Sequence, residues 1–163
     1  MSLSRGMDTQ VGRRRPLDYP FCVLVCDRDV AAATALVGQL RGLGHAAHCV
    51  HEPGDTLQAA ETLLPHVMLL ALPAPLAAHV ELTRRIREVL GLEQTYLVAL
   101  SDYDPDTTRS SVLEAGFDDL LWKPIGARLL EALMRYLSLK LRDIEADRPE
   151  GGCADQPPAA AAG

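Results

Sequence analysis

The segment "PHVMLLALPAP", residues 65–75, predicts a buried strand that ends in a loop. It is a short apolar run of mostly long aliphatic side chains, and Pro73 and Pro75 stop it. In a parallel α/β sheet, ligand chemistry usually lies at the carboxyl ends of the strands. The residue expected at this strand end is Ala71, whose methyl group is neither an acid, a base nor a nucleophile. The function therefore depends on what surrounds Ala71.

Strands and helices alternate regularly around this segment. Apolar runs predict five strands, at residues 21–27, 45–50, 66–72, 95–100 and 118–122. A helical pattern follows each strand, at residues 29–44, 54–64, 77–92, 105–116 and 126–146. Five βα units predict an α/β fold with a doubly wound, parallel five-stranded sheet. The flavodoxin-like strand order 2-1-3-4-5 suits a sheet of this size.

The two ends of the chain differ in composition from this alternating middle. Residues 1–19 show no apolar periodicity, and residues 147–163 combine glycine, proline and an alanine run. Such composition predicts a disordered N-terminal arm over 1–19 and a disordered tail over 147–163. The folded domain is expected over 20–146, with an extended last helix and no DNA-binding or catalytic domain after it.

Composition and charge exclude several classes of function. The net charge of −6 argues against a nucleic-acid surface. No apolar run approaches the roughly 18 residues of a membrane helix, and no signal-peptide pattern opens the chain. The four cysteines are not at metal-ligand spacings: Cys22, Cys26, Cys49 and Cys153. A cytoplasmic location is the simplest expectation.

Five short motifs occur in a fixed order along the folded part. They are "VLVCDRD" (23–29), "PHVMLLALPAP" (65–75), "VELTRRIRE" (80–88), "VALSDYD" (98–104) and "EAGFDDLLWKPI" (114–125). In this order and spacing they resemble the receiver domain of bacterial two-component response regulators, over roughly residues 21–140. Pro75 stands where that family has a proline four residues after its phosphoacceptor aspartate.

The resemblance also implies where a phosphorylation pocket would lie. In the family, two acids after the first strand and the phosphoacceptor aspartate hold Mg²⁺, while a Ser or Thr and a Lys bind the phosphoryl oxygens. The matching residues here are Asp27, Arg28, Ala71, Ser101 and Lys123. Leu120 stands at the position of the aromatic side chain that rotates on phosphorylation in many members.

The substitutions in this pocket predict that its chemistry is lost. Alanine at 71 cannot attack phosphorus, so no aspartyl phosphate can form there. Mg²⁺ prefers carboxylate oxygens, and one carboxylate, Asp27, remains against the cations of Arg28 and Lys123. We expect a neutral or positive pocket, no Mg²⁺ or other cofactor, and an ion pair from Asp27 to Lys123 or Arg28.

The last predicted helix carries an apolar seam at heptad spacing. Its members are Leu130, Met134, Leu137, Leu141 and Ile144. Packing on the sheet explains the first three, but a helix of this length overruns a five-residue strand. Leu141 and Ile144 therefore need a partner, and the seam predicts a homodimer through the last helix, with the adjoining helix and the fifth strand.

The remaining polar candidates have structural interpretations. Asp118 and Asp119 are expected to be solvated loop residues, and the arginines of the helix at 77–92 are expected to point outward, with Val80 and Ile86 inward. Cys26 is interpreted as a buried structural cysteine, with a redox-active thiol as the alternative. Three histidines recur at a spacing that alternates strand faces and are not expected to share a metal: His45, His48 and His51.

The favoured function is a receiver-like module that is not an enzyme and acts by protein–protein interaction without phosphoryl transfer. Its expected partners are a histidine kinase, another regulator or an effector of a bacterial two-component pathway. One alternative is a conventional phosphorylated regulator with a substitute acceptor such as Asp27. The other is a sensor that binds a small anion or nucleotide over Lys123 and Ser101.

Overall fold

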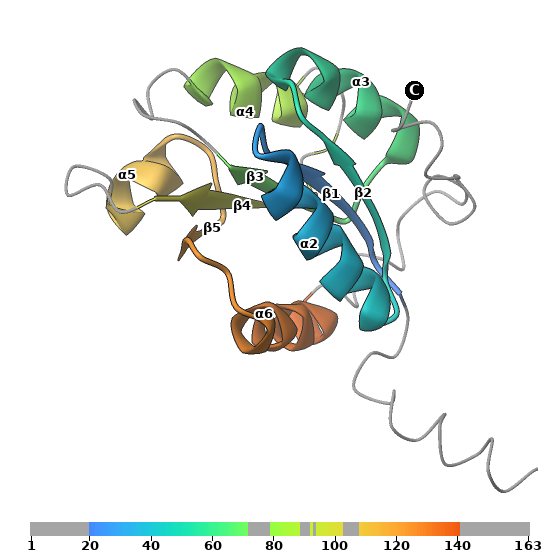
Figure 1. The fold of residues 1–163 in the computed structure, drawn as a ribbon. Coiled ribbons are helices and arrows are strands. Elements are labelled where there is room, and N and C mark those ends of the chain that lie inside the picture. Colours follow the sequence, from blue (N-terminus) through green and yellow to red (C-terminus); the bar gives the residue numbers. More distant parts are fainter. Residues whose placement is uncertain (1–19, 72–78, 89–91, 93, 103–107, 141–163) are drawn as a thin grey trace, which may run out of the picture.

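The predicted parallel sheet is present. The computed structural model describes residues 20–71, 79–88, 92, 94–102 and 108–140. Five parallel strands form one sheet in the order β2-β1-β3-β4-β5, which confirms the predicted order (Figure 1). The strands are β1 (Cys22–Cys26), β2 (Ala46–Val50), β3 (Val67–Ala71), β4 (Tyr96–Ser101) and β5 (Asp119–Trp122).

Five helices connect and cover these strands. They are α2 (Val30–Gly42), α3 (Pro53–Leu63), α4 (Val80–Glu88), α5 (Arg109–Glu114) and α6 (Ala127–Lys140). Each lies within its predicted range or one residue beyond it. The predicted arm over 1–19, the tail over 147–163 and the end of the last predicted helix, 141–146, lie outside the described residues. No described helix is long and apolar enough to cross a membrane.

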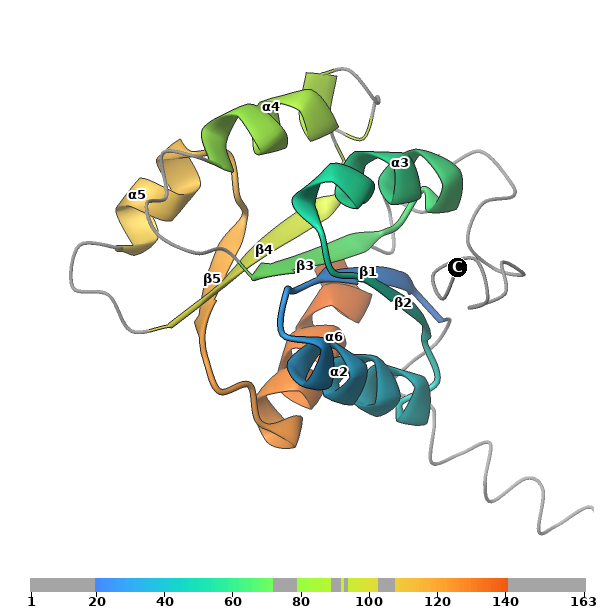
Figure 2. The same cartoon turned by 45° about the horizontal axis from the view of Figure 1, so that its top comes forward.

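The helices divide between the two faces of the sheet. α2 and α6 lie on one face, and α3, α4 and α5 lie on the other (Figures 1 and 2). Successive strand residues point to opposite faces, so Val23 and Val25 pack with α2 and α6 while Leu24 packs with the other three helices. Burial on both faces explains why the strands are continuous apolar runs and not alternating ones.

Both ends of α2 have well-defined caps, and the cap at its N-terminus fixes the loop that leaves β1. Asp29 is its N-cap, and its side chain accepts a hydrogen bond from the backbone N–H of Ala32 at 3.1 Å. At the other end Gly44 adopts a φ of 102°, a conformation that glycine allows without strain, and donates to the carbonyl of Arg41. The short loop over Asp27 and Arg28 is thus held against the carboxyl end of the sheet.

The seam of α6 faces the sheet, which corrects part of the predicted dimer surface. Leu130, Met134 and Leu137 are each 0% exposed and belong to the core between α6 and the strands. A side chain that is fully covered within its own chain cannot contact a second copy. Leu141 and Ile144 lie outside the described residues.

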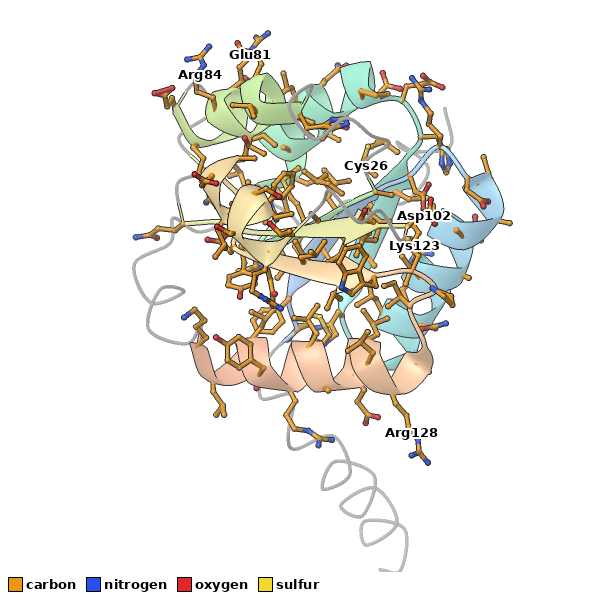
Figure 3. The ribbon with its side chains drawn as sticks, turned by 90° about the vertical axis from the view of Figure 1, so that its left-hand side faces the viewer. Cys26, Glu81, Arg84, Asp102, Lys123 and Arg128 are labelled. Atoms are coloured by element: carbon orange, nitrogen blue, oxygen red, sulfur yellow. The ribbon has the colours of Figure 1, made fainter. Side chains whose placement is uncertain are left out.

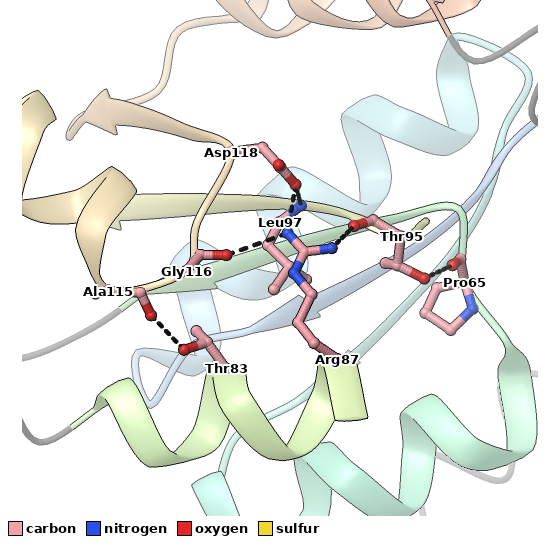
Figure 4. Close-up of polar contacts among 8 residues, drawn as sticks. All are labelled: Pro65, Thr83, Arg87, Thr95, Leu97, Ala115, Gly116 and Asp118. Carbon is pink, nitrogen blue, oxygen red and sulfur yellow. Dashed lines mark hydrogen bonds and ion pairs between the residues drawn. The ribbon is translucent and has the colours of Figure 1, made fainter. Parts of the chain in front are cut away.

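A polar cluster closes the amino ends of β4 and β5, and it corrects two expectations. Arg87 points inward from α4 and donates to the carbonyls of Thr95 and Gly116, at 2.7 and 3.1 Å (Figure 4). It also pairs with Asp118 at 2.7 Å, and the same carboxylate oxygen accepts from the backbone N–H of Leu97 at 2.8 Å. Asp118 is therefore a structural carboxylate that joins β4, β5 and α4, and not a solvated loop residue.

Further contacts between α4, α5 and the segment before β5 stabilise the same end of the sheet, at the amino ends of β4 and β5. Thr83 of α4 is buried and donates to the carbonyl of Ala115 (Figure 4). Gly116 follows with a φ of 110°, and a Cβ there would lie 2.9 Å from the Thr83 hydroxyl oxygen. Asp119 pairs with Arg109 and is likewise not a solvated loop residue. Val80, expected inward, is 43% exposed, because Thr83, Ile86 and the polar cluster fill the inner face of α4.

His45 is a buried neutral histidine near the start of β2. Its Nδ1 accepts a hydrogen bond from the backbone N–H of Phe21 at 3.0 Å, and its ring stacks on the Phe21 ring. The ring is 4% exposed. Burial, with a smaller contribution from nearby His66, lowers the pKa of His45 from 6.5 to about 4. The folded protein therefore holds His45 without a proton well below neutral pH.

We expect acid to destabilise the protein through His45. The folded pKa lies below the unfolded one, so the unfolded state binds the proton first and stability falls between pH 6.5 and about 4. A shift of this size corresponds to roughly 3 kcal/mol, and buried His48, whose pKa is also lowered, acts in the same direction. His45→Asn keeps a hydrogen-bond acceptor but has no ring that titrates. In urea unfolding, its free energy of unfolding should fall less on acidification than that of the unaltered protein. An equal loss in both proteins would contradict this assignment.

Candidate functional site

The carboxyl ends of the strands bring the predicted pocket residues to one edge of the sheet. Asp27 and Arg28 follow β1, Ala71 ends β3, Ser101 ends β4 and Lys123 follows β5. The strand ends lie side by side at the same edge of the sheet, as the register of the paired strands shows. The last pairs are Cys26 with Leu70, Ala71 with Leu100 and Ser101 with Trp122. Residues that are up to 96 positions apart in the chain are thereby brought into contact.

A cavity of about 630 Å³ opens at this edge. Four of the predicted pocket residues line it: Asp27, Arg28, Ala71 and Lys123. Ser101 does not line it, and its hydroxyl donates to the carbonyl of Asp102 at 2.8 Å. Leu120, at the position of the switch residue, is 4% exposed and packs in the core on the side of α3, α4 and α5.

Asp27 is the best-anchored side chain of the cavity. It is buried, and its Oδ2 lies 2.8 Å from the Lys123 Nζ, which confirms the expected ion pair. Its Oδ1 accepts a hydrogen bond from the backbone N–H of Asp29 at 2.9 Å. Both carboxylate oxygens are therefore engaged by donors from the protein itself. The pair links β1 to the loop after β5, where the Lys123–Pro124 peptide bond is cis.

This arrangement does not suit Mg²⁺. The ion needs several hard oxygen ligands in near-octahedral geometry, whereas the carboxylate of Asp27 is already occupied by two donors. Arg28 and Ala71 supply no oxygen ligand from their side chains. Within the described part of the chain, no group of three or more His, Cys, Asp or Glu side chains could hold a metal ion.

The described lining of the cavity carries a small excess of negative charge, which differs from the neutral or positive pocket expected from the sequence. Asp29 and Asp102 also line it, so three carboxylates face the two cations of Arg28 and Lys123. Asp29 lies there because it caps α2, and Asp102 because it directly follows β4. Figure 3 shows Asp102 and Lys123 near each other at this end of the sheet.

The apolar wall of the cavity is a feature that the sequence analysis missed. α2 contributes one face, and β4 and the segment after β5 contribute the rest: Ala32, Ala35, Leu36, Gln39, Leu100, Pro124 and Ile125. The α2 residues recur at spacings of three, one and three, which places them on one side of a helix. The two alanines of this set, Ala32 and Ala35, soon after the loop that carries Asp27, were the available signal.

Cys26 does not have the surroundings of a reactive thiol. It is 6% exposed and its Sγ lies 3.0 Å from the Thr56 hydroxyl. Burial raises the pKa of the Cys26 thiol, and Asp27, Glu52 and Asp55 raise it further against the opposing effect of Thr56. The thiol therefore stays protonated at neutral pH, which favours the structural interpretation.

Comparisons with solved structures support the fold. NtrX from Brucella abortus, in complex with ADP, aligns with a TM-score of 0.65 and 20% identity, over 78% of this chain and 29% of NtrX. A putative response regulator from Chloroflexus aurantiacus aligns with a TM-score of 0.65 and 22% identity, over 74% of this chain and 99% of that protein. The signal receiver domain of a putative Luxo repressor protein from Vibrio parahaemolyticus gives 0.64 and 20%, over 80% of this chain and 100% of that domain.

These likenesses establish the CheY-like, flavodoxin-like receiver fold. At such identities they show the fold alone. The sequence matches no protein-family model and none of the curated proteins. This chain spans less than a third of NtrX, so what the rest of such a protein does is not carried over. The chemistry of this protein must be argued from its own strand ends.

Proposed function

We propose that this chain is a degenerate receiver-like module of a bacterial two-component pathway, at work in the cytoplasm. It acts by protein–protein contact, without enzymatic activity and without phosphoryl transfer. Its partners are a histidine kinase, another regulator or an effector. The observation that carries the proposal is the pairing of Asp27 with Lys123 and with the N–H of Asp29, beside an alanine at the end of β3.

The ion pair supports a scaffold without bound Mg²⁺. A metal ion would have to displace Lys123 from Asp27 and would then face the positive charges of both Lys123 and Arg28. Lys123 instead neutralises Asp27 from within the protein and needs no ligand for that role. The site is held together by its own side chains.

Asp27 is also a poor substitute acceptor. A carboxylate that attacks phosphorus must present a free oxygen to the donor, in line with the leaving group. Asp27 is 4% exposed and both its oxygens already accept hydrogen bonds. The conventional regulator with a displaced acceptor is therefore the weaker alternative.

Intact-mass analysis tests this proposal. We expect no mass gain when the protein is incubated with a small phosphodonor and Mg²⁺, because Ala71 cannot attack phosphorus and both oxygens of the buried Asp27 carboxylate already accept hydrogen bonds. The matched variant Arg28→Asp/Ala71→Asp restores two carboxylates and is expected to gain one phosphoryl group. A gain of one phosphoryl group by the unaltered protein would overturn the proposal.

The face made by α5, β5 and α6 is the surface we propose for a second copy of this chain. β5 is one of the two edge strands of the sheet, and edge strands present a ready surface for pairing (Figure 1). Large apolar side chains on these three elements are exposed: Leu113, Trp122, Leu129, Tyr136 and Leu139. Leu139 is 71% exposed, on the side of α6 that its buried seam leaves open. The proposed homodimer thus uses the outer side of α6 and not Leu130, Met134 and Leu137, which are the described part of the predicted seam.

A further inference from the structure

The cavity beside α2 has the size and position of a ligand site. Its volume of about 630 Å³ falls within the roughly 300–1,000 Å³ of small-molecule pockets. It lies outside the carboxyl ends of β1 and β3, where the strand order reverses and where ligands of open α/β sheets bind. Small side chains leave this space open, since Ala32, Ala35 and Ala71 line it.

The mouth of the cavity carries both signs of charge. Asp27 and Lys123 neutralise each other. Three further charged residues, Arg28, Asp29 and Asp102, are exposed, and none of them forms an ion pair within the described part of the chain. Their side chains are available to a ligand that brings one positive and one negative group.

Beyond the mouth, the cavity is mostly apolar with one polar group. Ala35 and Ile125 supply hydrocarbon surface for an apolar side chain, with Leu36 behind them. Gln39 also lines the cavity, and its Oε1 is buried without a hydrogen-bond partner among the described residues. The polar side chain of Gln39 thus marks the inner end of an otherwise apolar wall.

We propose that the cavity binds an apolar zwitterion, either a free amino acid or a short peptide with an apolar side chain. The carboxylate of the ligand binds Arg28 beside the positive N-terminal end of α2. The ammonium group binds Asp102, and the apolar side chain packs against Ala35 and Leu36.

This assignment fits the lining better than a nucleotide does. Among the residues that the structure describes, thirteen line the cavity, and none of them has an aromatic side chain on which a base could stack. Three carboxylates, Asp27, Asp29 and Asp102, would repel a polyphosphate, whereas one of them is needed to bind an ammonium group. The inference and the proposed loss of phosphorylation can fail separately, because one is tested by ligand binding and the other by phosphoryl transfer.

Thermal shift and titration calorimetry test the proposal with stated probes. We expect L-leucine, L-phenylalanine or Leu-Leu at millimolar concentration to raise the melting temperature, because a ligand that binds only the folded state stabilises it. Two analogues that lack one charge, 4-methylpentanoate and 3-methylbutylamine, should bind at least tenfold more weakly. If only the free amino acids bind, the ligand of the cavity is a free amino acid. If only the dipeptide binds, the ligand is a short peptide.

Variants locate the binding. Arg28→Gln and Asp102→Asn are expected to weaken the probe at least tenfold, and Ala35→Leu, which fills the wall, should abolish binding. Arg85→Gln is the control, because Arg85 is exposed on α4 and does not line the cavity. The proposal is overturned if no zwitterion binds, if ATP or inorganic phosphate binds more tightly than the zwitterions, or if Arg28→Gln and Arg85→Gln bind equally well.

Discussion

Replacing Lys123 with methionine is expected to lower the free energy of unfolding by about 3–5 kcal/mol. The substitution keeps most of the volume and removes the charge that neutralises Asp27. Asp27 is 4% exposed and would keep the N–H of Asp29 as its donor. A buried carboxylate without its cation costs far more than an exposed ion pair gains.

A double-mutant cycle measured by urea unfolding separates the energy of the Asp27–Lys123 ion pair from the energy of the packing around it. Asp27→Asn/Lys123→Met buries no unpaired charge and should recover most of the loss. The chain has one other lysine, Lys140 on α6, which is exposed and lies over the Tyr136 ring. Lys140→Met should therefore change stability by no more than about 1 kcal/mol.

The pH dependence of the Lys123→Met variant gives a second readout. Without its cation the buried carboxylate of Asp27 carries an unpaired charge, and acid that protonates it removes that charge. Both proteins lose stability in acid through His45, so the readout is the difference in unfolding free energy between them at each pH. The difference in unfolding free energy between the variant and the unaltered protein should become smaller below about pH 4. A gap that stays constant would mean that the variant lost packing and not charge compensation.

The fold was predictable because its signals are local and repeated. Each strand is a continuous apolar run such as 67–71, buried on both faces, and each run is followed by a helical pattern. The stop at Gly44 and the cap at Asp29 are set by backbone sterics and a side chain three positions away. Such features need no knowledge of distant parts of the chain.

The candidate site was predictable only in part, because several of its determinants are non-local. The Asp27–Lys123 pair followed from the resemblance, which aligned two residues far apart in the chain. The charge of the cavity did not follow, since Asp102 and Asp29 lie there only through the sheet register and the helix cap. Arg87 was assigned outward by helical periodicity, but its partner Asp118 is reached across the sheet edge and fixes it inward.

The two sides of α6 give the clearest test of what this helix does. Leu137→Ala is expected to destabilise the protein by about 2–5 kcal/mol, because Leu137 is 0% exposed and its truncation leaves a cavity against the sheet. Leu139→Ala, two residues away and 71% exposed, should change the unfolding free energy of the monomer by no more than about 0.5 kcal/mol. Urea unfolding at low protein concentration measures both.

Sedimentation then distinguishes the core side from the proposed dimer side. Leu139→Ala removes exposed apolar surface and should weaken self-association, whereas Leu137→Ala should lower stability equally at every protein concentration, because its contacts lie within one chain. If the cost of Leu137→Ala grew with protein concentration, the seam would belong to an interface after all. If the unaltered protein stayed a monomer at high concentration, the dimer would be excluded and the face of α5, β5 and α6 would be left to a different partner.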